Sequence, residues 1–167
     1  LEVVEEYKAR SPWKPWTLLR TRDAWTLALG WSIPQLAAMG FLIHMTGILQ
    51  AFGHDVMFGI TLLGVMWPFG LLSHYVCGVC DRAFGTKKTS IGVCCVLICG
   101  AALLLFAQNA VCAAAGVAIY MAGVSANMNV FMSMTMTIYG RYDFEAVWPT
   151  LNVISQFVLR CGAVVVA

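Results

Sequence analysis

Long apolar runs alternate with short polar stretches along most of the chain. From this pattern we predict five membrane-spanning helices, at about Ala24–Phe52, Val56–Val79, Ser90–Ala107, Ala110–Tyr139 and residue 146 to the end. Each run is near or above the roughly 20 residues that a helix needs to cross a bilayer. Pro34 and Pro68 lie inside the first two runs, where we expect them to break the helices. The polar stretches are short, so neighbouring helices should be antiparallel.

The composition supports a membrane protein. Of the 167 residues, 60% are hydrophobic and 11% are charged, whereas soluble domains carry roughly 25% charged residues. We therefore predict an all-α fold, a polytopic transmembrane helix bundle. The net charge of +2 includes no basic patch typical of nucleic-acid binding. We also expect no cofactor and no metal, and we interpret the seven cysteines as small residues that pack between helices.

The basic residues indicate the topology. Residues 1–23 are polar and basic, with tryptophans interleaved, as in a cytoplasmic linker leading to the membrane interface. The second connection (81–88) carries three basic residues and the fourth (140–145) carries one, whereas the first (50–55) and the third (108–109) carry none. By the positive-inside rule the linker and the second and fourth connections are cytoplasmic. We expect a multi-pass protein of the cytoplasmic (inner or plasma) membrane with a cytoplasmic N-terminal segment.

Arg160 is the most unusual residue of the predicted spans. It is the only formal charge after Glu145, and a charge at the membrane centre costs at least about 2.5–3.5 kcal/mol. Such a charge persists where it faces water, pairs with an acid or binds an anion. By helix rise, Gln35 and Trp67 lie roughly 17 Å into their spans, and Gln156 and Arg160 roughly 15–21 Å into the fifth. All four should therefore lie near the midplane.

One polar turn resembles a known signature. The stretch from Gly78 to Lys88 resembles the cytoplasmic loop signature of the major facilitator superfamily: a small residue, an acidic–basic pair, a glycine and a basic pair. The resemblance implies that contacts of this loop hold the cytoplasmic side closed in one state of the transport cycle. It assigns that gating role to Gly78, Asp81, Arg82, Gly85, Lys87 and Lys88.

A second stretch narrows the resemblance. Residues 139–149 are similar to the loop between helices 10 and 11 of oxalate/formate-antiporter-like and monocarboxylate-type facilitators. The five spans would then be helices 7–11, the C-terminal half of a twelve-helix transporter whose N-terminal half is missing from this chain. Helices 7, 8, 10 and 11 would line the substrate cavity, with helix 9 outside.

The resemblance implies a secondary active transporter, not an enzyme. Its substrate would be a small organic anion, such as a mono- or dicarboxylate, carried by uniport, antiport or proton symport. Arg160 would hold the carboxylate, and Gln35, Trp67 and Gln156 would line the site. His74 falls near the helix-8 position where the family carries a second basic residue. That difference favours a singly charged anion, or one that moves with a proton.

Two alternatives stay open. One is another facilitator, such as a drug/proton antiporter, which should carry an acid within the membrane. The other is a polytopic subunit without transport activity. Within the fourth span, Ser125, Asn127 and Asn129 either join helices through hydrogen bonds or line the cavity.

Overall fold

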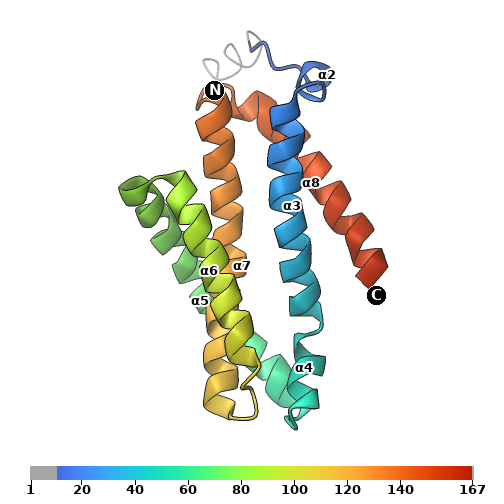
Figure 1. Ribbon diagram of the computed structural model, residues 1–167, viewed down its shortest axis with the longest axis vertical. Helices are drawn as coiled ribbons and strands as arrows, with labels where there is room; N and C mark the ends of the chain where they lie inside the picture. The colour runs from blue at the N-terminus through green and yellow to red at the C-terminus, as the bar shows by residue number, and fades with distance from the viewer. Residues whose placement is uncertain (1–10, 167) are drawn as a thin grey trace. The chain divides into compact units, whose positions relative to one another are not determined.

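The computed structural model describes residues 11–166, and for residues 162–166 the backbone alone. All of its regular elements are helices (Figure 1). They are α2 (Pro15–Leu18), α3 (Arg22–Ile43), α4 (Met45–Ala51), α5 (Val56–Phe84), α6 (Thr86–Leu104), α7 (Ala110–Tyr139) and α8 (Phe144–Val166).

Four of these helices, α3, α5, α6 and α7, are long and apolar enough to cross a membrane. The predicted all-α bundle is therefore confirmed, and its composition is that of a multi-pass membrane protein. The helix α8 has 23 residues, which is also sufficient length for a span. That α8 crosses a membrane stays a prediction.

Neither proline interrupts its helix, so this expectation was wrong. Pro34 lies inside α3 and Pro68 inside α5. A glycine stands four residues before each proline, Gly30 and Gly64, at the carbonyl that the proline ring would crowd. A glycine lets the backbone adjust around the ring at small steric cost.

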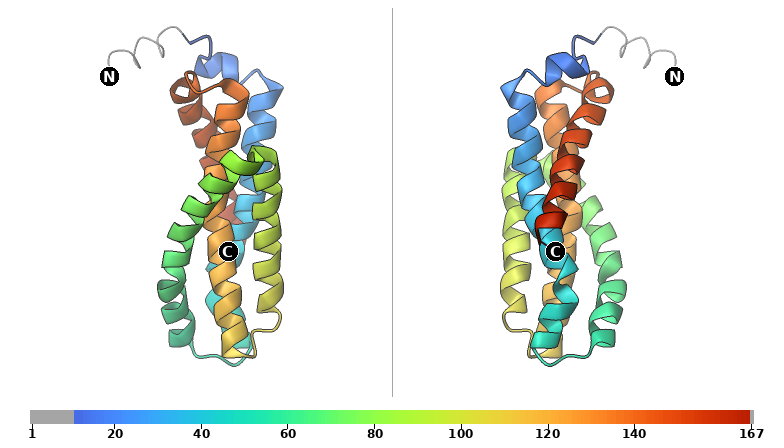
Figure 2. Two further views of the ribbon diagram at one scale, coloured as in Figure 1. Left: turned by 90° about the vertical axis from the view of Figure 1, so that its left-hand side faces the viewer. Right: turned by 90° about the vertical axis from the view of Figure 1, so that its right-hand side faces the viewer.

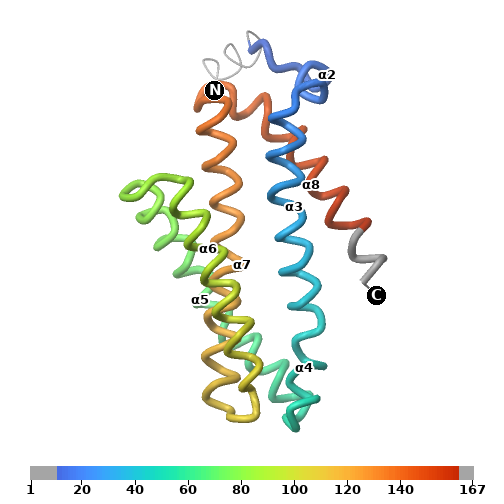
Figure 3. The backbone as a smooth tube through the Cα atoms, viewed as in Figure 1, coloured from blue at the N-terminus to red at the C-terminus, as the bar shows by residue number. Residues whose placement is uncertain are grey.

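The first predicted span breaks at His44 instead, between α3 and α4 (Figure 3).

The connection expected at residues 81–88 is much shorter in the structure. The helix α5 continues to Phe84, α6 begins at Thr86, and Gly85 alone separates them. Gly85 has φ 84° and ψ 154°, a conformation that is open essentially to glycine alone. The two helices therefore form a hairpin whose turn depends on one residue (Figure 2).

The chain divides into two compact units. Of the described residues, unit 1 comprises 11–37 and 131–166, and unit 2 comprises 38–130. The helices α3 and α7 each contribute one end to either unit.

In unit 2, glycines bring α6 and α7 together. A Cβ added to Gly100 of α6 would lie 2.7 Å from the backbone nitrogen of Tyr120 on α7. In the opposite sense, a Cβ on Gly116 of α7 would lie 2.9 Å from Leu104, and one on Gly123 would lie 2.8 Å from Leu97. Each helix thus offers glycines where the other places a larger residue, which is how membrane helices approach closely.

Two further helices pack on α7 in unit 2. On the α5 side, a Cβ on Gly70 would lie 2.6 Å from the hydroxyl of Ser125. On the α3 side, the Tyr120 hydroxyl donates a 3.0 Å hydrogen bond to the carbonyl of Ala38. The Tyr120 ring also packs against Phe41, with the ring centroids 4.8 Å apart. The middle of α7 is therefore the centre of this unit.

Unit 1 is built on aromatic contacts between α3, α7 and α8. The rings of Trp31 and Phe131 stack with centroids 4.4 Å apart, and Trp148 lies 5.0 Å from Phe131. The hydroxyls of two fully buried residues, Thr135 and Ser155, donate to carbonyls one turn back in their own helices. Their hydrogen bonds are therefore satisfied locally.

The contact between α6 and α7 predicts the effect of a small substitution. Gly100→Ala should lower the free energy of unfolding by about 1–3 kcal/mol, since the new methyl group meets backbone atoms. The measurement is chemical or thermal unfolding of the purified chain in detergent, followed by circular dichroism. Gly92→Ala on the same helix is the matched control, because its Cβ would meet no atom within 4 Å. Equal stability of the two variants would contradict this packing.

Candidate functional site

Three of the predicted substrate residues belong to unit 1. Gln35 lies on α3 and is buried, with 5% of its surface exposed. Gln156 and Arg160 lie on α8, where Gln156 is half-buried and Arg160 is exposed. Because they are four residues apart, these two side chains lie on one face of α8, one turn from each other. An amide and a guanidinium in that arrangement can donate hydrogen bonds to the same carboxylate.

The other two predicted substrate residues, Trp67 and His74, lie on α5 in unit 2. The Trp67 side chain is 61% exposed, and His74 is half-buried. They are seven residues apart and so lie on the same side of α5, two turns from each other.

Two hydrogen bonds join α5 to α7 at this level. The amide nitrogen of Asn129 donates a 2.9 Å hydrogen bond to the backbone carbonyl of His74. One turn along α5, the Cys77 thiol donates to the carbonyl of Ala126, with 3.7 Å between sulfur and oxygen. For Asn129, of the two roles left open, the structure favours joining helices. The hydrogen bond therefore holds the backbone of His74 and does not depend on the conformation of its imidazole ring.

The predicted gating residues surround the Gly85 turn rather than a loop. Gly78, Asp81 and Arg82 belong to the last turns of α5, and Lys87 and Lys88 to the first turn of α6. Three basic side chains, all exposed, therefore lie at one end of the α5–α6 hairpin.

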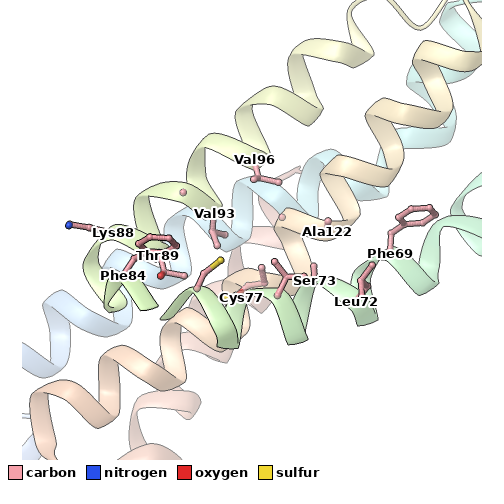
Figure 4. A pocket seen from close by; sticks show the side chains of 15 residues that line it. Phe69, Leu72, Ser73, Cys77, Phe84, Lys88, Thr89, Val93, Val96 and Ala122 are labelled. Carbon is pink, nitrogen blue, oxygen red and sulfur yellow. The ribbon is translucent and has the colours of Figure 1, made fainter. Parts of the chain in front are cut away.

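An apolar groove in unit 2 was not predicted from the sequence (Figure 4). It has a volume of about 560 Å³ and is lined by α5, α6 and α7. Its walls include Phe69 and Phe84 of α5 and Val93 of α6, and its floor is formed by small residues of α7, among them Ala122 and Ala126. We expected the third span outside the substrate cavity, and here α6 forms one wall of a different hollow.

The sequence did contain a signal for this groove. Gly92 of α6 and Gly123 of α7 are small lining residues within long apolar runs. Small residues allow either close helix contact or a hollow, and the spacing does not distinguish the two. The structure does: Gly123 lies close to Leu97, whereas an added Cβ on Gly92 would have no neighbour within 4 Å.

Comparisons with protein-family models, with curated proteins and with solved structures found no match to this chain. The family resemblance therefore stays a prediction.

The turn between α5 and α6 gives a prediction at Gly85. Gly85→Ala should cost about 1–3 kcal/mol of stability, because the observed backbone angles are unfavourable for any residue with a Cβ. Gly78→Ala is the control: Gly78 is helical, and a Cβ there would meet no atom within 4 Å. Unfolding of both variants in detergent measures the difference. If Gly85→Ala were as stable as the control, the turn would not require glycine.

Proposed function

We propose that the chain is part of a secondary active transporter for a small organic anion, working by alternating access in a cytoplasmic membrane. The proposal rests chiefly on Arg160. This residue lies sixteen positions after the first residue of α8, roughly 24 Å along the helix by its rise.

The acidic residues of the described chain do not supply an obvious partner within the helices. Asp23, Asp55, Asp81, Asp143 and Glu145 all lie within a few residues of a helix end. In a membrane-spanning α8, as we propose, the guanidinium would face water, pair with an acid or bind an anion, and we propose that it binds an anion. A substrate carboxylate would be that anion, and the fork of N–H groups on arginine suits a carboxylate.

The neighbouring side chain on α8 supports the same ligand. Gln156 lies one turn before Arg160 and carries an amide that donates hydrogen bonds without adding charge. The guanidinium balances a single negative charge, and the neutral amide adds hydrogen bonds only. We therefore propose a monocarboxylate as the preferred substrate, with His74 carrying the proton of a coupled cycle.

The basic end of the α5–α6 hairpin would take part in gating. We propose that Arg82, Lys87 and Lys88 face the cytoplasm and that ion pairs made there form and break as the transporter opens and closes. The one-residue turn would keep α5 and α6 moving as a pair.

The substrate role of Arg160 predicts a transport defect. In proteoliposomes containing the full-length transporter, Arg160→Gln should raise the concentration of a labelled monocarboxylate needed for half-maximal uptake by about 10- to 100-fold. That range corresponds to the loss of a charged hydrogen bond. Arg160→Lys should retain part of the affinity. Arg141→Gln is the control, since Arg141 is an exposed residue of the turn before α8. Unchanged uptake by Arg160→Gln would refute the anion site.

The coupling role of His74 makes a separate prediction. His74→Gln should abolish uptake driven by an imposed pH gradient and preserve the exchange of labelled for unlabelled monocarboxylate, because exchange needs no net proton movement. The hydrogen bond from Asn129 goes to the backbone carbonyl of residue 74 and not to its ring, so the helix contact should survive the substitution. Gradient-driven uptake by His74→Gln at the wild-type rate would exclude this residue as the proton carrier.

A further inference from the structure

The lining of the groove between α5, α6 and α7 has few polar side chains: Ser73, Cys77, Cys80, Thr89 and, at one end, Lys88. Three of its polar side chains are already bonded within the chain. The Ser73 hydroxyl donates to the carbonyl of Gly70, the Thr89 hydroxyl to that of Gly85, and the Cys77 thiol to that of Ala126. A sugar, a peptide or a heterocycle lying there would leave its own polar atoms unsatisfied. The part of the groove lined by these bonded side chains therefore suits an apolar chain.

The dimensions of the groove suit such a chain in a membrane. Its lining on α5 runs from Phe69 to Phe84, roughly 22 Å by helix rise, whereas one leaflet of hydrocarbon is about 15 Å deep. The volume of about 560 Å³ lies within the usual range for bound small molecules. Because α5 and α6 are long and apolar enough to span a membrane, lipid chains would be the medium around them.

One end of the groove is positively charged. Lys88 belongs to its lining, and Figure 4 shows the ammonium group at the end of the hollow, directed away from the other labelled side chains. Arg82 and Lys87 are exposed nearby in sequence, on either side of the Gly85 turn. An occupant with its apolar chain among the helices would thus present its polar end to these cations.

We propose that this groove binds one anionic phospholipid, with an acyl chain between α5 and α6 and the phosphate at Lys88. Charge complementarity selects the anionic headgroup over a zwitterionic one, since basic residues near a membrane surface attract anionic lipids. The site shares Lys88 with the gating end of the proposed transporter but lies apart from the proposed substrate residues on α3 and α8. It uses α5, α6 and α7, and none of Gln35, Gln156 or Arg160 lines it.

Native mass spectrometry of the purified chain, released from detergent, tests the proposal. The probes are phosphatidylglycerol and phosphatidylcholine with identical acyl chains. We expect one tightly bound phosphatidylglycerol per chain, with an affinity about fivefold or more above that for phosphatidylcholine. Equal affinities for the two lipids would overturn the proposal, and so would a chain that carries no bound lipid after its release from detergent. So would pairing of two chains that excludes lipid, because a second copy would then be the occupant.

Two pairs of variants separate the headgroup from the acyl chain. Lys88→Gln should remove the preference for phosphatidylglycerol, whereas Lys87→Gln, an exposed neighbour outside the lining, should largely keep it. Gly92→Leu should fill the hollow and weaken both lipids, whereas Gly47→Leu, on α4 outside the lining and with no atom within 4 Å of its added Cβ, should not. Circular dichroism checks that each variant is folded. A folded Gly92→Leu chain that binds phosphatidylglycerol as the wild type does would place the lipid elsewhere.

Discussion

The contact between α6 and α7 is the constraint on which unit 2 depends. Water cannot drive helices together inside a membrane, so their association relies on van der Waals packing and polar contacts. Here glycines of one helix receive larger residues of the other, in both directions. This reciprocity fixes the rotation of the two helices, because turning either one would press a side chain against backbone. Once α6 is fixed on α7, the one-residue turn at Gly85 restricts where α5 can lie.

The same packing explains why the apolar groove exists. Gly100 and Gly123 allow close approach along the seam, whereas α5 is attached to α7 at other positions, through Gly70, Cys77 and Asn129. Two helices held to a third along different lines leave a space between them. Most of the apolar stretch of α5 is not buried by the chain itself, so lipid or other protein must cover it. The groove is the part of that surface with a defined shape.

The sequence predicted the broad architecture well because hydrophobic length is a strong signal. The span Ala110–Tyr139 was placed with its observed bounds. The errors concern local backbone geometry. Pro34 and Pro68 satisfy the usual rule for a broken helix, yet each follows a glycine by four residues, and the helices continue. The second connection carried enough polar residues for a loop, but membrane helices can extend past the apolar core, and only Gly85 had to leave the helix.

The candidate substrate site was harder to predict than the fold. Arg160, Gln156 and Gln35 stood out because polar groups are costly at membrane depth, and their cost is visible in a sequence. The groove was not anticipated because its lining is mainly apolar, and apolar side chains carry no free-energy penalty inside a membrane. Glycine, alanine and valine form tight contacts and hollows with the same pattern, and only their three-dimensional placement separates the two. Sequence reasoning therefore suggests candidate polar sites more readily than apolar ones.

The buried hydroxyls of unit 1 have a mechanical consequence. The hydroxyls of Thr135 and Ser155 donate to carbonyls of their own helices. These two donated hydrogen bonds therefore do not link neighbouring helices. Stacked rings such as Trp31 and Phe131 tolerate sliding far better than a hydrogen bond does. These two hydroxyls therefore do not resist sliding of one helix along another, whereas the Asn129 hydrogen bond holds α5 at a fixed level along α7 in unit 2.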